Sequence, residues 1–127
     1  MNTVFLESPY SGATDEIIAR NVKYARACCT HSYHVMGEAP VALHLLYTQL
    51  PEGQFVSDNE VVLRGREFAL QCCREVRKKM GRVVFYVDLG WSNGMLQSRA
   101  ECEKDGIPWE VRWIYEKPVN PDNDSSV

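Results

Sequence analysis

The run from Val83 to Val87 constrains the fold more than any other part of the chain, because it is apolar, β-branched and aromatic over the length of a strand. It is followed by Asp88 and Gly90, which predict a turn, and by Ser92, which can cap a helix. A strand, loop and helix in this order are typical of a parallel sheet, where ligands bind at the carboxyl ends of the strands. We therefore expect the functional site at this junction.

An earlier β-α unit begins almost at the N-terminus. Residues 3–8 predict a buried strand, and Thr14 is a good N-cap for a helix whose first turn is acidic. Ile18, Val22, Ala25, Cys29 and Met36 follow a helical period, and Gly37 would end that stripe. Residues 39–43 then predict a short second strand.

Two more helices surround the central strand. Ser57 to Glu60 matches a capping box, and the stripe of Val61, Gly65, Phe68, Cys72, Val76 and Met80 predicts a helix that ends at Gly81. A second helix is predicted from Ser92 to Asp105, with Gly106 at its end. Residues 109–115 alternate apolar and polar side chains, which is typical of an edge strand.

Strands separated by helices of this length predict an α/β fold with right-handed crossovers. We expect a single-domain, three-layer Rossmann-like architecture over residues 1–116, with a parallel sheet of four or five strands in the order 2-1-3-4. In that order the loop at Ser8–Gly12 and the loop at Asp88–Gly94 face each other across one crevice. Residues 117–127 are rich in Pro, Asn, Asp and Ser, and predict a disordered tail.

Composition excludes several classes of protein. The net charge of −3 over 127 residues argues against a duplex nucleic acid as partner. No apolar run approaches the roughly 20 residues of a membrane span, and no secretory leader is recognisable, so we expect a cytoplasmic protein without a membrane partner. The five cysteines are odd in number and lack a C-x-x-C spacing, which predicts neither a disulfide framework nor a metal site. No cofactor is expected.

Several residues near the two loops can carry chemistry. A carboxylate at the end of a buried strand, as at Glu7, is costly unless it is paired or used. Asp88 can bind a ribose hydroxyl or hold a proton, or it can fix its own turn. Ser92 to Gly94 can cradle a phosphate at a helix start, or form an ordinary N-cap. His44 is either a packed residue or part of the same site.

Five short motifs follow one another along the chain: Glu7–Gly12, Asn21–Ala25, Gly37–Pro40, His44–Tyr47 and Asp88–Met95. In their order and spacing the sequence resembles small uncharacterised domains related to the nucleoside 2-deoxyribosyltransferases, and the resemblance covers residues 3–115. Many members of that superfamily cleave the N-glycosidic bond of nucleosides or nucleoside monophosphates and pass the sugar to water or to another base.

The resemblance implies a nucleoside or nucleotide ligand and a homo-oligomer, for which Trp109, Trp113 and Tyr115 are a possible contact surface. One position departs from the superfamily: Ser98 stands where its catalytic glutamate is expected, and serine cannot replace a carboxylate in that chemistry. Glu7 and Asp88 are therefore the candidate catalytic residues. Residues implied in substrate binding are Ser8, Pro9, Tyr10, Ser11, Gly12, His44, Gly90, Ser92, Asn93, Gly94 and Met95.

Three hypotheses follow for the function. The first is an enzyme that cleaves an N-glycosidic bond or transfers a (deoxy)ribosyl group. The second is a catalytically inactive protein that binds a nucleotide-derived signal as a sensor or by sequestration. The third is an oligomeric scaffold without a ligand. The sequence alone leaves all three open.

Overall fold

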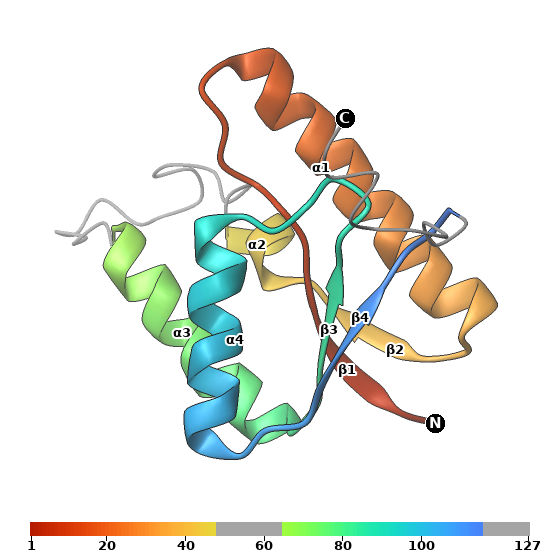
Figure 1. Ribbon diagram of the computed structural model, residues 1–127, viewed down its shortest axis with the longest axis vertical. Helices are drawn as coiled ribbons and strands as arrows, with labels where there is room; N and C mark the ends of the chain where they lie inside the picture. The colour runs from red at the N-terminus through yellow and green to blue at the C-terminus, as the bar shows by residue number, and fades with distance from the viewer. Residues whose placement is uncertain (48–64, 116–127) are drawn as a thin grey trace, which may run out of the picture.

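The computed structural model describes residues 1–47 and 65–115 of the chain. Strands and helices alternate along it, with one π-helical turn, η1, continuing the first helix (Figure 1). The elements are β1 (Thr3–Glu7), α1 (Asp15–Thr30), η1 (His31–Val35), β2 (Ala39–Val41), α2 (Leu43–Tyr47), α3 (Arg66–Met80), β3 (Val83–Tyr86), α4 (Asn93–Asp105) and β4 (Trp109–Arg112).

The four strands form one parallel sheet in the order β2-β1-β3-β4. Phe5 lies opposite Val83, and Val83 lies opposite Trp109, so the two inner strands are β1 and β3. This arrangement confirms the predicted Rossmann-like α/β fold and the predicted strand order.

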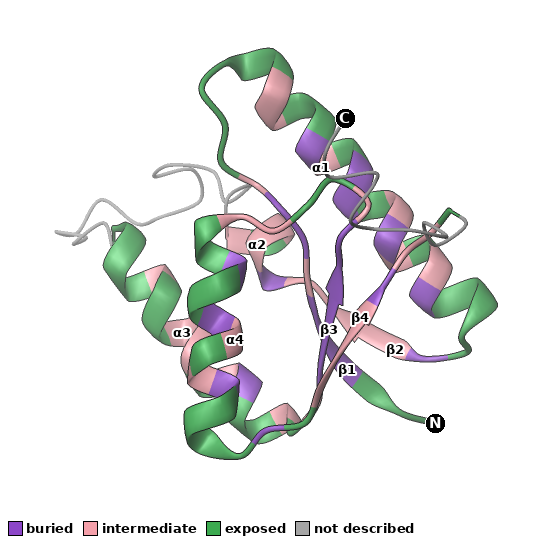
Figure 2. Ribbon diagram, in the orientation of Figure 1, coloured by how far each residue is buried: buried purple, intermediate pink, exposed green. Residues whose placement is uncertain are grey.

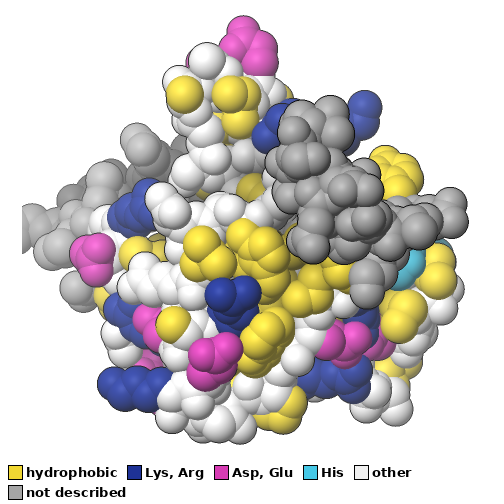
Figure 3. Space-filling model, viewed as in Figure 1, with side chains coloured by type: hydrophobic (Ala, Val, Ile, Leu, Met, Phe, Trp, Pro, Cys, Tyr) yellow, Lys and Arg dark blue, Asp and Glu magenta, His cyan; other side chains and the backbone are white. Residues whose placement is uncertain are grey.

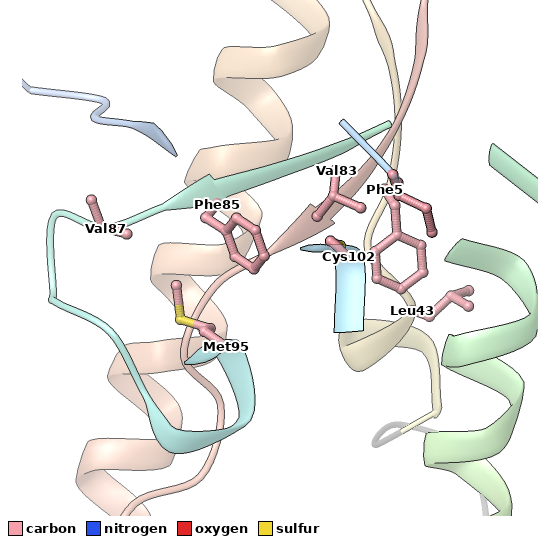
Figure 4. Packing of buried hydrophobic residues seen from close by; sticks show 8 residues of the cluster. Phe5, Leu43, Val83, Phe85, Val87, Met95 and Cys102 are labelled. Atoms are coloured by element: carbon pink, nitrogen blue, oxygen red, sulfur yellow. The ribbon is translucent and has the colours of Figure 1, made fainter. Parts of the chain in front are cut away.

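Helices cover both faces of the sheet, which makes three layers (Figure 1). Figure 2 shows that the two inner strands are buried over most of their length, and Figure 4 shows the packing on the face covered by α2, α3 and α4. Alternate strand residues supply the two cores, as the period of a strand requires. The core on that face contains Phe5, Leu43, Val83, Phe85, Val87, Met95, Cys102 and Ile107; the core beneath α1 contains Val4, Leu6, Tyr24, Cys28, Val84 and Tyr86.

Four predicted helix ends are confirmed. Thr14 caps α1 by accepting the Ile17 N–H, and Ser92 caps α4 by accepting the Met95 N–H at 3.2 Å. Gly81 and Gly106 end α3 and α4 in the left-handed conformation, with φ of 70° at both residues. The short-range capping signals in the sequence therefore placed these ends correctly.

The predicted stripe of α1 is displaced from the buried face. The helix buries Asn21, Tyr24, Ala25 and Cys28, whereas Met36 lies beyond the helical turns and is 45% exposed. The buried face carries Tyr24, whose hydroxyl donates a hydrogen bond to Asp88 just after β3. Amphipathic periodicity does not register a polar anchor of this kind.

Other boundaries also differ from the prediction, and β4 ends at Arg112 rather than at residue 115. Gly65 is extended (φ −94°, ψ −169°), so α3 begins at Arg66, after a residue that is unfavourable within helices. The second strand ends at Val41 rather than at the predicted residue 43, because α2 begins at Leu43. The predicted capping box at Ser57–Glu60 and the predicted tail at 117–127 lie outside the described residues.

Candidate functional site at the carboxyl edge of the sheet

The loops that follow β1 and β3 leave the sheet from the same edge (Figure 1). The two strands are adjacent and parallel, so their carboxyl ends must lie together. This edge therefore holds the loop Ser8–Gly12 and the loop Asp88–Gly94. Some of the candidate side chains lie on the face covered by α3 and α4, and others lie on the face covered by α1.

Glu7 is the last residue of β1, and its side chain faces α3 and α4. The hydroxyl of Ser98 in α4 donates a hydrogen bond to its Oε2 atom, and Arg77 Nη1 donates to the same hydroxyl at 3.0 Å. Burial raises the pKa of Glu7 to about 7, while Ser98 and Arg77 oppose that rise. A carboxyl group with this pKa can both hold and release a proton near neutral pH.

Arg77 anchors this group of side chains from α3. It is 3% exposed, and its Nη2 atom forms an ion pair with Glu101 of α4. A buried guanidinium requires such a partner, because an unpaired buried charge is costly. Within residues 1–47 and 65–115, Arg77 Nε is buried and has no hydrogen-bond partner. The Arg77–Glu101 pair thus fixes the Ser98 hydroxyl against Glu7.

Ser8 and His44 form a second polar pair at the same edge. Ser8 is buried directly after β1, and its Oγ atom lies 2.8 Å from Nε2 of His44, in α2. Burial lowers the pKa of His44 to about 4, so the imidazole is neutral at neutral pH. The pair is suited to hydrogen bonding with an uncharged group, such as a sugar hydroxyl, rather than to charge pairing with phosphate.

The loop after β1 is held by Asn21, which is buried in α1. Its Nδ2 atom donates to the carbonyl oxygens of Tyr10 at 2.9 Å and Ser11 at 3.3 Å. A Cβ atom at Gly12 would clash with the side chain of Ile17, so a larger residue would push the loop away from α1. Pro9 is buried and Tyr10 is half-buried, which leaves part of the Tyr10 side chain accessible.

The loop after β3 turns at Gly90, where φ is +91°, and reaches the N-terminus of α4. Ser92 is occupied as the N-cap, and Met95 is 2% exposed in the core. Asn93 and Gly94 are exposed, and a Cβ atom at Gly94 would meet nothing nearer than Ser92 Oγ, 3.9 Å away. The first turn of α4 thus has open space above a glycine, and backbone N–H groups at such a position attract anions.

Asp88 is held on the other side of the sheet from Glu7. Its Oδ1 atom accepts the Tyr24 hydroxyl at 2.5 Å and the Ile114 N–H at 2.9 Å, and its Oδ2 atom accepts the Tyr115 N–H at 3.1 Å. Its own N–H donates to the Tyr24 hydroxyl at 2.8 Å. Tyr24 belongs to the core beneath α1, whereas the partners of Glu7 belong to α3 and α4. The two candidate catalytic carboxylates are therefore not brought together, and Asp88 ties β3, α1 and the end of β4 to one another.

A family model described as a domain of unknown function (DUF7768) matches residues 2–112 of the chain. The chain belongs to this family. The matched range of the DUF7768 domain includes every described strand and helix and both edge loops. No curated protein and no solved structure matches the sequence.

Two shallow hollows on the DUF7768 domain lie away from this edge. One, of about 370 Å³, is lined by Arg82, Pro108 and their neighbours at the opposite end of the sheet. The other, of about 380 Å³, is lined by residues of α1 and η1 together with Ile114. Neither is lined by a residue of the two edge loops.

No helix in the described part of the chain is long and apolar enough to span a membrane.

Two residues that shape the candidate site of this DUF7768 domain, Arg77 and Asn21, were not among the predicted site residues. Arg77 lies in the basic last turn of α3, where a positive charge is expected for the helix dipole, and nothing nearby marked it as buried. Asn21 had a weak signal, because it lies four residues after Ile17 on a helix with an apolar stripe. A polar residue on the inner side of such a stripe indicates a buried hydrogen bond.

Proposed function

We propose that this DUF7768 domain binds a nucleoside or nucleoside monophosphate at the carboxyl edge of its sheet and cleaves the N-glycosidic bond. Glu7 is the proposed catalytic acid. The observation that carries the proposal is the pKa of about 7 of this carboxyl group at a strand end. Perturbed carboxyl groups at such positions are candidates for proton transfer.

Cleavage of an N-glycosidic bond needs two kinds of assistance. The departing base must be protonated as the bond breaks, and the sugar develops oxocarbenium-like positive charge that water then captures. A Glu7 carboxyl group donates its proton to the base, and the attacking water returns a proton to the carboxylate as it becomes the new sugar hydroxyl. The products are free base and free sugar or sugar phosphate, and Glu7 ends the cycle protonated.

The contact between Ser98 and Glu7 supports this assignment. Ser98 stands where the nucleoside 2-deoxyribosyltransferases that the sequence resembles are expected to carry their catalytic glutamate. Its hydroxyl is bonded to the carboxylate of Glu7. A carboxyl group thus lies next to the position from which that glutamate would extend, but it comes from β1 instead of α4.

The neighbouring groups fit the rest of such a ligand. The open first turn of α4 at Gly94 suits a 5′-phosphate, because helix N-termini favour anions. The neutral pair of Ser8 and His44 suits a sugar hydroxyl, and Tyr10 offers a ring on which a base can stack. Transfer to a second base in place of water would use the same groups.

A second candidate function is nucleotide binding without turnover. It is favoured by the environment of Asp88, whose two oxygens already accept three hydrogen bonds on the opposite face of the sheet. Glycosidases commonly use two carboxyl groups beside the bond that breaks. If a second carboxylate is required, this domain retains a ligand site and acts as a sensor or by sequestering the nucleotide.

A panel of ribo- and deoxyribonucleosides and their monophosphates separates the two functions. Chromatography should detect free base with the wild-type protein and with Glu16→Gln, a matched change at an exposed glutamate of α1, but not with Glu7→Gln. Ligand-dependent thermal stabilisation without base release would favour the binding function, since a ligand that binds only the folded state stabilises it. Neither signal with any member of the panel would exclude both.

A further inference from the structure

One face of α1 carries residues that hold both edge loops. Asn21 and Tyr24 are 1% and 7% exposed, and they lie three positions apart in the helix. Residues at this spacing share a face and lie roughly 4.5 Å apart along the helix axis. Asn21 contacts the loop Ser8–Gly12, whereas Tyr24 contacts the start of the loop Asp88–Gly94. The two loops are therefore attached to a single helix.

Asn21 holds the first loop through its side-chain amide. Nδ2 donates to the carbonyl oxygens of Tyr10 and Ser11, and Oδ1 accepts from the guanidinium of Arg20. Among the residues that the structure describes, no backbone N–H donates to these two carbonyl oxygens. Figure 3 shows the first turns of α1 projecting from the rest of the molecule, and residues 11–14 before them are exposed. The position of this loop therefore depends on the amide of Asn21.

Tyr24 holds the second loop through both the side chain and the backbone of Asp88. Its hydroxyl donates to Asp88 Oδ1 at 2.5 Å and accepts the Asp88 N–H at 2.8 Å. Burial and the bond to Asp88 raise the pKa of Tyr24, so the hydroxyl stays protonated and keeps its donor. The Gly90 N–H donates to the Val87 carbonyl at 2.9 Å, which closes the turn at Asp88. A shift of Asp88 would therefore move the segment that leads to Ser92.

We propose that Asn21 and Tyr24 are positioning residues for the nucleotide site, and that each sets one end of it. This inference rests on the proposed function, in which Tyr10 stacks on the base and Gly94 lies beside the phosphate. Asn21 fixes the backbone of Tyr10 and so the end that receives the base. Tyr24 fixes the start of the loop that reaches Gly94 and so the end that receives the phosphate. A ligand that bridges the loops binds more tightly when both are already in place.

Neither positioning residue acts through the proposed catalytic acid. Glu7 is bonded to Ser98, and through it to Arg77, on the face covered by α3 and α4. Tyr24 belongs to the core on the other face, and Asn21 lies one turn before it in α1. Changes at these two positions should therefore raise KM and leave the pH dependence of base release unchanged. A loss of stability alone would produce neither this separation nor a preference between ligands.

Two conservative variants separate the two ends of the site in calorimetric titrations with each nucleoside of the panel and its monophosphate. Asn21→Asp keeps the size of the side chain but replaces the donor by a carboxylate, which repels the two carbonyl oxygens. It should weaken binding of the nucleoside and of the monophosphate equally, by about tenfold. Tyr24→Phe removes only the hydroxyl and should weaken binding of the monophosphate by about tenfold, with a smaller loss for the nucleoside.

Matched controls are available in the same part of the chain. Lys23→Gln, at an exposed position of α1, changes the net charge in the same sense and by the same amount as Asn21→Asp. Tyr33→Phe removes a hydroxyl from a tyrosine that is 63% exposed. Both controls should bind the ligands as the wild-type protein does. Asn21→Ala removes the donor without adding a charge, and it replaces Asn21→Asp if that variant does not fold.

Amide hydrogen exchange without ligand tests the attachment of the loops independently of any reaction. Asn21→Asp should speed exchange at residues 8–12, and Tyr24→Phe should speed it at residues 88–94, each without changing the other loop. Unchanged exchange in both variants would overturn the proposal, as would a Tyr24→Phe protein that loses both ligands equally. Failure of the proposed function is distinguishable, because the wild-type protein itself would then bind no member of the panel.

Discussion

The carboxylate of Glu7 accepts a hydrogen bond from the hydroxyl of Ser98, which lies 91 residues further along the chain. Arg77 donates to that same hydroxyl and is neutralised by Glu101, so strands and helices from three parts of the sequence meet at one carboxyl group. Glu7 has a pKa of about 7 because burial outweighs these favourable contacts. The proposed chemistry depends on this balance.

Glu7→Gln should make the stability of the protein less sensitive to pH. The pKa of Glu7 is raised in the folded state from an ordinary value of 4.5 to about 7, so the folded state favours the protonated form. The stabilisation is complete below pH 4.5 and is lost as pH rises through about 7. Between these values wild-type protein should lose up to about 3 kcal/mol of unfolding free energy relative to Glu7→Gln. Urea unfolding of both proteins across this pH range measures the difference, and parallel curves would contradict the assignment.

Ser98→Ala should raise the pKa of Glu7 further, because the hydrogen bond from Ser98 is the largest contribution that lowers it. The pH at which base release declines should move upward, since the proposed acid must be protonated. A carbon NMR titration of the Glu7 carboxyl group gives the same information without turnover. Ser32→Ala is a matched control at a buried serine that donates to Glu38 at 2.8 Å, and it should leave the Glu7 titration unchanged.

Gly94→Ala should reduce affinity for nucleoside monophosphates while leaving the fold stable. A methyl group there meets no atom closer than Ser92 Oγ at 3.9 Å, and alanine is favoured over glycine in helices. The methyl group would occupy space proposed for a phosphate oxygen. Calorimetric titration should therefore show a larger loss for a monophosphate than for its nucleoside. Equal losses for both ligands would place the phosphate elsewhere.

Glu38→Ala should be strongly destabilising, because it leaves a buried guanidinium without its main partner. Arg112 forms two hydrogen bonds of 2.6 Å with Glu38, and the two side chains are 6% and 5% exposed. Removing one partner of such a pair costs roughly 3 to 5 kcal/mol. Glu110→Ala, at a side chain that is 39% exposed, should cost less than about 1 kcal/mol. Denaturant unfolding compares the two variants.

The pair of Glu38 and Arg112 should also make the stability of the protein depend on pH in the acid range. The hydrogen bonds from Arg112 hold the pKa of Glu38 below its ordinary value of 4.5. Its contribution to stability is therefore present above pH 4.5 and is lost as pH falls below that value. Unfolding curves between pH 3 and 6, recorded for wild type and Glu38→Gln, should converge at the acid end. A constant difference between them would contradict this account.

The sequence by itself determined the order of strands and helices and the parallel sheet. Val83 to Val87 is apolar enough to identify a central strand, and Thr14, Ser92, Gly81 and Gly106 mark helix ends through bonds to residues a few positions away. Such signals are local, so they can be recognised in the sequence without knowledge of the fold. They also placed the loops after β1 and β3 at one edge, because parallel strands and short crossovers leave few alternatives.

Only the tertiary structure decided what the candidate residues contact. Glu7 and Asp88 end adjacent strands, but the first turns toward Ser98 and the second toward Tyr24, on opposite faces of the sheet. Arg77 resembled an exposed basic residue in the sequence, and its burial depends on Glu101 in another helix. Charge, burial and proton affinity depend on atoms that are close in space and distant in sequence. The pattern of residues along the chain therefore placed the candidate residues at one edge of the sheet, and the packing of the helices on the sheet set their burial and proton affinity.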